Sequence, residues 1–67
     1  MRISYNRLWK LLIDKNMKKS DLRQQAGISS SSMAKLGKGD NITTDVLLRI
    51  CESLECNIED IMETVDE

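Results

Sequence analysis

Hydroxyl and ammonium side chains gather between residues 17 and 39, in the segment MKKSDLRQQAGISSSSMAKLGKG. Serine hydroxyls are short enough to approach the base edges and phosphates of a nucleic acid, and lysine ammonium groups attract phosphates. Large apolar residues in place of the serines would instead indicate a protein interface. These residue types therefore favour contact with a polyanion, provided that the local structure brings them onto one surface.

The same segment has the pattern of two short helices joined at Gly27. A helix that ends at residue 26 needs a left-handed residue to reverse the chain, and glycine reaches that conformation without a Cβ penalty. Ser29 is a suitable N-cap for a second helix over residues 30–38. Two such helices, crossing around a small shared core, form a helix-turn-helix, whose second helix can lie in the major groove of DNA. The apolar positions at helical spacing that would make this core are Leu22, Ala26, Ile28, Met33 and Leu36.

The run of four serines over residues 29–32 also has the composition of a flexible linker. Against that interpretation, Ile28 precedes the run, and Met33 and Leu36 follow it at helical spacing. Packing of these apolar side chains would hold the serines in a helix.

The rest of the chain predicts further short helices. One over residues 5–15 carries a leucine stripe and ends at a turn residue, Asn16; the first helix of the pair begins at residue 18 or 19. Gly37 and Gly39 break the chain before another helix, which Thr43 or Thr44 caps. The residues expected to line the cores of these helices are Leu8, Leu11, Leu12, Val46, Leu47, Ile50, Cys51 and Leu54.

A last short helix is expected after Asn57, because Asp60 stands at the third position of a capping box. Its inward-facing residues would be Ile58, Ile61 and Met62. The two ends of the chain, residues 1–4 and 63–65, are expected to pair as short strands. The predicted fold class is all-α, with five helices in a single domain over residues 1–67.

Length and composition exclude several classes of protein. A chain of 67 residues is near the lower limit for unaided folding, and it has one Tyr, one Trp and no Phe, so the core must be aliphatic. With no apolar run long enough for a signal peptide or membrane span, we expect a cytoplasmic protein that does not bind membranes. Cys51 and Cys56 are expected to be free thiols, since they are five positions apart within or beside one predicted helix and no His or third Cys completes a metal site. Without a His, a nucleophile beside a base, or a phosphate-binding glycine loop, we expect no enzyme activity, cofactor, metal or small-molecule ligand.

Charge is distributed very unevenly along the chain. Residues 1–40 carry nine basic and three acidic side chains, whereas residues 41–67 carry one basic and eight acidic side chains. A net charge of −1 therefore does not argue against nucleic-acid binding, because a polyanion responds to the local field. The positive half contains the predicted helix-turn-helix.

At this point the chain resembles the lambda-repressor-like, or Cro/repressor (XRE), helix-turn-helix family. Residues 19–36 carry the family's apolar pattern, VLLRICESLECNIEDIM is similar to its fourth and fifth helices, and ISYNRLWKLLIDKNMKK is similar to its first. The resemblance covers residues 3–62, and the whole also resembles a subgroup of very small stand-alone regulators from bacteria, phages and mobile elements. Three positions depart from the family pattern: Lys19 replaces a common Gln, Arg23 a usual Ala, and Gly37 a frequent Glu.

The resemblance implies roles for individual residues. Ser30 and Ser31 would reach base edges from the start of the second helix, with Ala34 and Lys35 one turn further on. Lys35 would bond guanine acceptors. Phosphate contacts, which give affinity rather than sequence choice, would come from Lys18, Lys19, Arg23, Ser29, Lys38, Asn41 and Thr43.

A domain of this size reads only a few base pairs, so specificity suggests a homodimer on a palindromic operator. Tyr5, Trp9 and Ile13 are four residues apart and form a second apolar stripe, which is the candidate dimer interface. The favoured alternative is cover within the chain, by the last helix and the tail.

The leading functional hypothesis is a transcriptional regulator, a repressor, that binds double-stranded DNA sequence-specifically. The alternative is a protein-interaction module of the same fold, antitoxin-like or antirepressor-like, that acts through its acidic C-terminal half. The absence of any acidic residue among positions 30–35 favours DNA binding.

Overall fold

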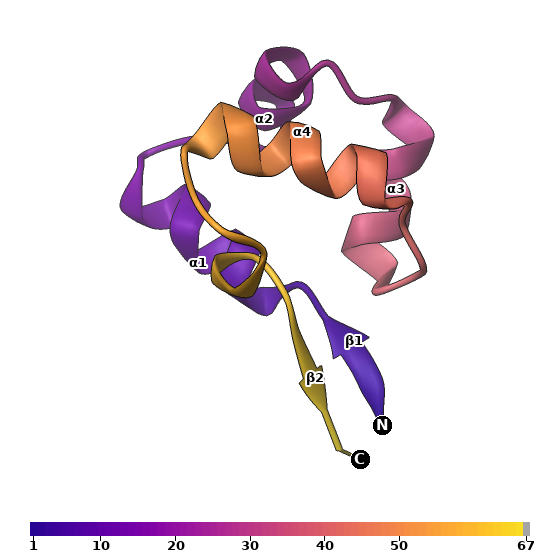
Figure 1. Ribbon diagram of the computed structural model, residues 1–67. Coiled ribbons are helices and arrows are strands. Elements are labelled where there is room, and N and C mark those ends of the chain that lie inside the picture. The colour runs from indigo at the N-terminus through magenta and orange to yellow at the C-terminus, as the bar shows by residue number, and fades with distance from the viewer. Residues whose placement is uncertain (67) are drawn as a thin grey trace.

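The computed structural model describes residues 1–66, which form four α-helices, one 3₁₀ turn and a two-stranded sheet. In chain order the elements are β1 (Arg2–Ser4), α1 (Asn6–Asp14), α2 (Lys19–Ala26), α3 (Ser30–Lys38), α4 (Thr44–Leu54), η1 (Ile58–Asp60) and β2 (Glu63–Val65). Helix α4 crosses the molecule, with α2 packed along it, α3 near one end, and α1 with η1 on the other side (Figure 1). Within residues 1–66, no helix is long and apolar enough to span a membrane.

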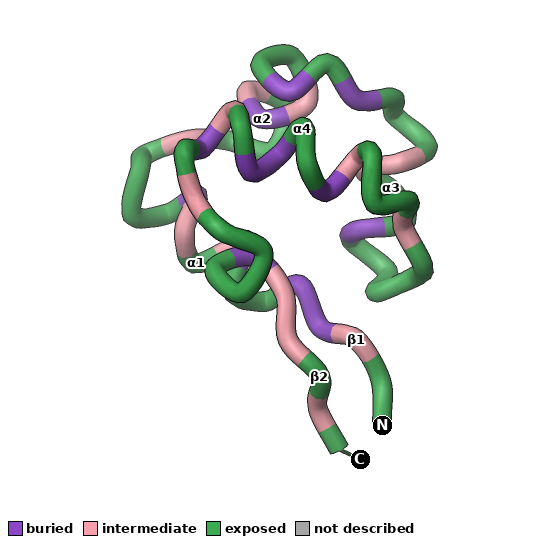
Figure 2. Tube along the Cα trace, in the orientation of Figure 1, coloured by how far each residue is buried: buried purple, intermediate pink, exposed green. Residues whose placement is uncertain are grey.

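One core holds these elements together. Five side chains are essentially inaccessible to solvent, and each comes from a different segment: Leu8, Leu22, Leu36, Ile50 and Ile61. The leucine stripe of α1 and the apolar face of α4 surround them as the sequence predicts, with Leu11 and Val46 packed at the edge. The helix-turn-helix therefore rests on α4 and does not depend on contacts between α2 and α3 alone (Figure 2).

Helix ends follow the local signals in the sequence. Gly27 and Asn16 have positive φ angles of 67° and 56°, and the hydroxyls of Ser29 and Thr43 accept hydrogen bonds from the N–H groups of Ser32 and Val46. These four residues satisfy or redirect the free backbone groups at helix ends. The predicted caps and turn residues are confirmed at all four positions.

The two ends of the chain pair as an antiparallel ladder, in the register Arg2↔Val65, Ile3↔Thr64 and Ser4↔Glu63. This confirms the predicted strands. Arg7 strengthens the junction, because its guanidinium donates to the Glu59 carbonyl at 2.9 Å and lies 3.4 Å from the Glu63 carboxylate. Both chain ends consequently lie on one side of the helices (Figure 1).

Three expectations need correction. The expected fifth helix is a single 3₁₀ turn, because the chain must extend again at Glu63 to pair with β1. The predicted capping contact is present, since Asp60 accepts a hydrogen bond from the Asn57 N–H at 2.9 Å. Ile58 is 40% exposed and so does not face inward as Ile61 does. Gly37 continues α3 rather than breaking it; only Gly39, with φ 76°, reverses the chain.

Candidate nucleic-acid interface

Helix α3 presents one continuous polar face. Leu36 is buried, Met33 is partly buried against the core, and Ser32 is partly buried. The opposite side of the helix is exposed along its whole length and carries the four residues expected to read bases: Ser30, Ser31, Ala34 and Lys35. At helical spacing these four are neighbours, so the structure brings them onto one surface.

The serines at the start of α3 are not equivalent. The Ser29 hydroxyl accepts from the Ser32 N–H and donates to the Ser32 hydroxyl, both at 3.1 Å. It is also 3.0 Å from the Ser31 hydroxyl, so Ser31 is engaged within this cap. The Ser30 hydroxyl makes no hydrogen bond within residues 1–66, which leaves it available to an external acceptor or donor. Sequence spacing alone does not distinguish Ser30 from Ser31.

Two lysines mark the start of α2. Lys18 is the N-cap residue, and its backbone N–H donates to the Asp21 carboxylate at 3.0 Å. The Lys19 ammonium lies 4.4 Å from the centroid of the Trp9 ring. Lys18 and Lys19 are exposed, whereas Arg23, one turn further along α2, is half-buried.

The loop after α3 is fastened to the body of the molecule. The Tyr5 hydroxyl donates to the Asp40 carbonyl at 3.0 Å, across 35 residues of sequence. Lys38, Asn41 and Thr43, the predicted phosphate-contacting residues of this region, are exposed on either side of that anchor. The Thr43 hydroxyl accepts from Val46 as the cap of α4, so its remaining capacity for a phosphate is as a donor.

Arg49 makes a structural contact in this region that the sequence analysis did not predict. From α4 its guanidinium donates to the Gly27 carbonyl at 3.3 Å and to the Asp45 carboxylate at 3.1 Å. The contact joins the supporting helix to the turn between α2 and α3. The available signal was compositional, since Arg49 is the one basic residue in the acidic half of the chain.

The predicted apolar stripe on α1 is divided by the fold. Tyr5 is only 4% exposed, because its ring lies in the core beside the loop after α3. It is therefore not available for the candidate dimer interface. Trp9 is half-buried under Lys19, and Ile13 is 73% exposed. Trp9 and Ile13 line a small hollow of about 180 Å³ together with Leu12, Met17 and Lys19.

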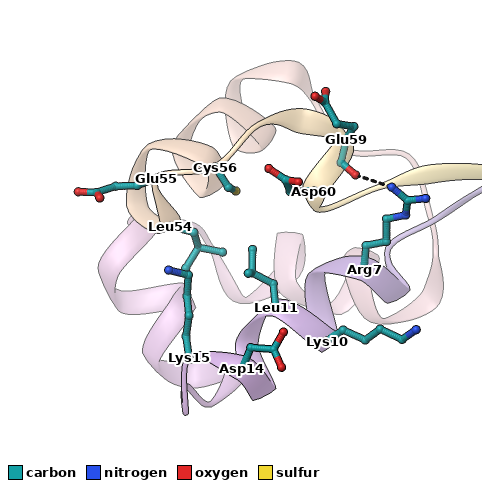
Figure 3. A pocket seen from close by; sticks show the side chains of 10 residues that line it. All are labelled: Arg7, Lys10, Leu11, Asp14, Lys15, Leu54, Glu55, Cys56, Glu59 and Asp60. Atoms are coloured by element: carbon teal, nitrogen blue, oxygen red, sulfur yellow. Dashed lines mark hydrogen bonds between the residues drawn. The ribbon is translucent and has the colours of Figure 1, made fainter.

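A hollow of about 440 Å³ lies away from the helix-turn-helix, between α1 and the chain around η1. Its lining has basic residues from α1 and acidic residues at and around η1, with Arg7 bonded to the Glu59 carbonyl (Figure 3). None of its lining residues comes from α2 or α3. This hollow is therefore not part of the surface that α3 presents.

Both cysteines are free thiols, as predicted, with Cys51 buried and Cys56 half-buried. Burial, followed by the neighbouring Cys51, raises the pKa of the Cys56 thiol to about 11. Burial also raises the pKa of Cys51. Both groups are protonated near neutral pH and are poor nucleophiles there.

Comparison with known proteins agrees with this geometry. A family model of the Cro/C1-type helix-turn-helix DNA-binding domain matches residues 7–67. A crystal structure of the transcriptional regulator VanUg, form II, is similar with a TM-score of 0.94 and 56% sequence identity, covering 98% of this chain and 88% of that chain. Among curated proteins none matches. The family match includes the helix-turn-helix together with the α4 helix that supports it.

Proposed function

The chain belongs to the Cro/C1-type helix-turn-helix DNA-binding domains, and from this premise we propose that it is a sequence-specific repressor that inserts α3 into the major groove. Family membership and the similarity to a transcriptional regulator make it a DNA-binding regulator rather than an enzyme. The proposal adds the mode of binding and the sign of regulation. In this proposal the bound domain represses by blocking access to the DNA that it covers.

The observation that carries the proposal is the exposed polar face of α3. Its backbone is fixed by Leu36 beneath, the Ser29 cap at one end and Gly39 at the other. A face held in this way can present Ser30 and Lys35 to base edges with little loss of conformational entropy on binding. We assign base reading to Ser30, Ser31, Ala34 and Lys35, with Ser30 and Lys35 as the principal donors.

Phosphate contacts would flank this face. The start of α2 and the loop after α3 lie on either side of the recognition helix in sequence and both carry exposed polar groups. Backbone N–H groups at helix starts add to such contacts. The proposed set is Lys18, Lys19, Arg23, Ser29, Lys38, Asn41 and Thr43.

We also propose that two copies bind a palindromic operator. A single recognition helix contacts too few base pairs for high specificity, and symmetric half-sites are read by symmetric dimers. Ile13, with most of its side chain in solvent beside the apolar hollow, supports α1 as the dimer surface. With Tyr5 buried and the Trp9 ring under Lys19, the proposed interface is centred on the exposed side chain of Ile13.

The test is selection from a random pool of duplex DNA, at low and at physiological salt, with sequencing of the bound fraction. Recovery of a short inverted repeat at both salt concentrations would support a sequence-specific dimer. A promoter carrying that repeat, fused to a reporter, then measures the sign of regulation. Weak binding without a motif, lost at physiological salt, would contradict specific reading by α3.

A second candidate function is protein binding through the acidic half. A hollow of about 360 Å³ on α4 and η1 is lined by Glu52, Glu55 and Asp60 and by no basic residue. Leu48, 55% exposed, stands at its edge. A basic protein partner would fit this surface, and the failure of the DNA selection would favour it. Of the eight acidic residues of that half, the proposed binding surface uses Asp45, Glu52, Glu55, Glu59, Asp60 and Glu63.

A further inference from the structure

The contact between Trp9 and Lys19 connects helix α1 to the start of α2, which belongs to the proposed DNA-binding surface. Trp9 comes from α1 and is half-buried against the core, whereas Lys19 is the first residue of α2 and is exposed. The Lys19 ammonium sits 4.4 Å from the ring centroid, within the range of a cation–π interaction. Within residues 1–66 the Lys19 side chain makes no hydrogen bond or ion pair, and the Trp9 ring is the group that holds its ammonium there.

The position of Lys19 is electrostatically unfavourable for the isolated domain. The start of a helix carries the positive end of the helix dipole, and cations are disfavoured there. Lys18 and Lys19 place two positive charges at this end of α2, with Asp21 as the acidic residue in its first turn. The negative face of the Trp9 ring offsets part of that cost.

A lysine is also a poorly oriented phosphate ligand. Its four-carbon stem rotates freely, and fixing it on binding costs conformational entropy. The hollow that contains Trp9 also contains Leu12, Ile13 and Met17, so the stem of Lys19 lies beside apolar surface. Ring and hollow together restrict the ammonium before any ligand arrives.

We propose that Trp9 is a positioning residue for DNA binding, whose ring holds the Lys19 ammonium at the start of α2 in the orientation that meets a DNA phosphate. An ammonium group has three N–H donors, and contact with a ring on one side leaves donors directed outward. The lysine is therefore held and still able to bind an anion. This inference rests on the proposed role of Lys19 as a phosphate contact.

The test is a double-mutant cycle in DNA affinity. The variants are Trp9→Leu, which removes the ring and keeps an apolar side chain, Lys19→Ala, and the two combined. Trp9→Phe keeps a ring, and Lys15→Ala is a matched lysine control, since Lys15 lies in the hollow near η1 and outside the proposed interface. The probe is a mixed-sequence duplex of about 20 base pairs, or two helical turns, at low salt.

We expect Trp9→Leu to weaken binding about two- to five-fold, and Trp9→Phe to weaken it less. In the Lys19→Ala background the Trp9→Leu change should have no effect, because the residue through which Trp9 acts is gone. NMR supplies a second readout. The side-chain methylene protons of Lys19 next to the ammonium should show an upfield ring-current shift that persists in the DNA complex and disappears in Trp9→Leu.

Equal losses from Trp9→Leu in both backgrounds would overturn the inference and assign Trp9 to folding or to dimerisation, which thermal unfolding and sedimentation would then separate. Tighter binding by Trp9→Leu would also overturn it, by showing that ring and phosphate compete for the ammonium. The binding of the unaltered protein and of Lys19→Ala tests the proposed DNA-binding function itself. If the unaltered protein does not bind the duplex, or if Lys19→Ala weakens binding no more than Lys15→Ala, then the proposed phosphate contact itself fails.

Discussion

The Tyr5 hydroxyl donates a hydrogen bond of 3.0 Å to the backbone carbonyl of Asp40. This contact joins the residue before α1 to the loop after α3, which carries proposed phosphate contacts on both sides of Asp40. Tyr5 is 4% exposed, so the phenol combines a buried ring with one directed polar group. The relationship suggests that the core residue Tyr5 sets the conformation of a loop at the binding surface.

Replacing Tyr5 by Phe tests that role. The variant keeps the ring and leaves the Asp40 carbonyl without its donor, so we expect a loss of about 1 kcal/mol in the free energy of unfolding. Affinity for DNA should fall as well, because the loop then has to be ordered on binding. Urea unfolding and DNA titration measure the two effects. Unchanged DNA affinity in a destabilised variant would confine Tyr5 to the core.

Two glycines, Gly27 in the turn before α3 and Gly37 within α3, should respond to alanine in opposite directions. Gly37 lies inside the helix, and an added Cβ would meet no atom within 4 Å, so Gly37→Ala should stabilise the fold by about 0.5–1 kcal/mol. Gly27 has φ 67°, and Gly27→Ala should destabilise it by about 1–2 kcal/mol, although the nearest atom, Arg49 Nη1, is 3.8 Å away. Thermal unfolding of both variants measures these changes in stability. A loss of stability in Gly37→Ala would mean that the end of α3 is not the regular helix described above.

Lys35 and Lys19 should differ in the kind of loss that they produce. Lys35→Ala should relax preference at one or two base positions, because Lys35 lies on the exposed face of α3. Lys19→Ala should weaken binding to all sequences and reduce the salt slope by about 1. Selection of sites with each variant, followed by titration at several salt concentrations, separates the two. Identical effects of both changes on every sequence would contradict this division of roles.

Ile13 should affect assembly and not folding. It is 73% exposed, so Ile13→Asp has little buried surface to lose and its stability should remain within about 0.5 kcal/mol of the original. If α1 forms the dimer surface, the introduced charge should abolish paired occupancy of an inverted repeat while single half-sites are still bound. Sedimentation with DNA of one and of two half-sites measures this. Paired binding that survives the substitution would place the dimer contact elsewhere.

The free energy of unfolding should fall at alkaline pH because of Cys56. Its pKa is about 11 in the folded protein, against 9.0 for an unperturbed thiol. Between these values the unfolded chain releases the proton while the folded chain retains it, so the stability present below pH 9.0 is lost progressively as the pH rises toward 11. Replacement of Cys56 by Ala should make the alkaline decline shallower. The same decline in both proteins would mean that other groups cause it.

The sequence by itself determined the four α-helices, the caps of α3 and α4 and the turn between α2 and α3, but not that the expected fifth helix is a single 3₁₀ turn. Gly27, Ser29, Thr43 and Asn16 act on backbone groups within one turn of themselves, so the pattern of neighbours is sufficient to predict them. The apolar spacing of α1 and α4 likewise identified the faces that pack into the core, because a helix has a fixed period.

Only the tertiary structure decided the burial and the contacts of side chains that are distant from each other in the sequence. It buried Tyr5, left Ile13 in solvent and set Trp9 under Lys19, although the three α1-side residues share one spacing. It also exposed Ile58 and gave Arg49 its contact with Gly27. These outcomes depend on the angles at which helices cross and on how far β2 must extend to reach β1. Local spacing carries no information about either quantity, so residues of the same type and period came to have different roles.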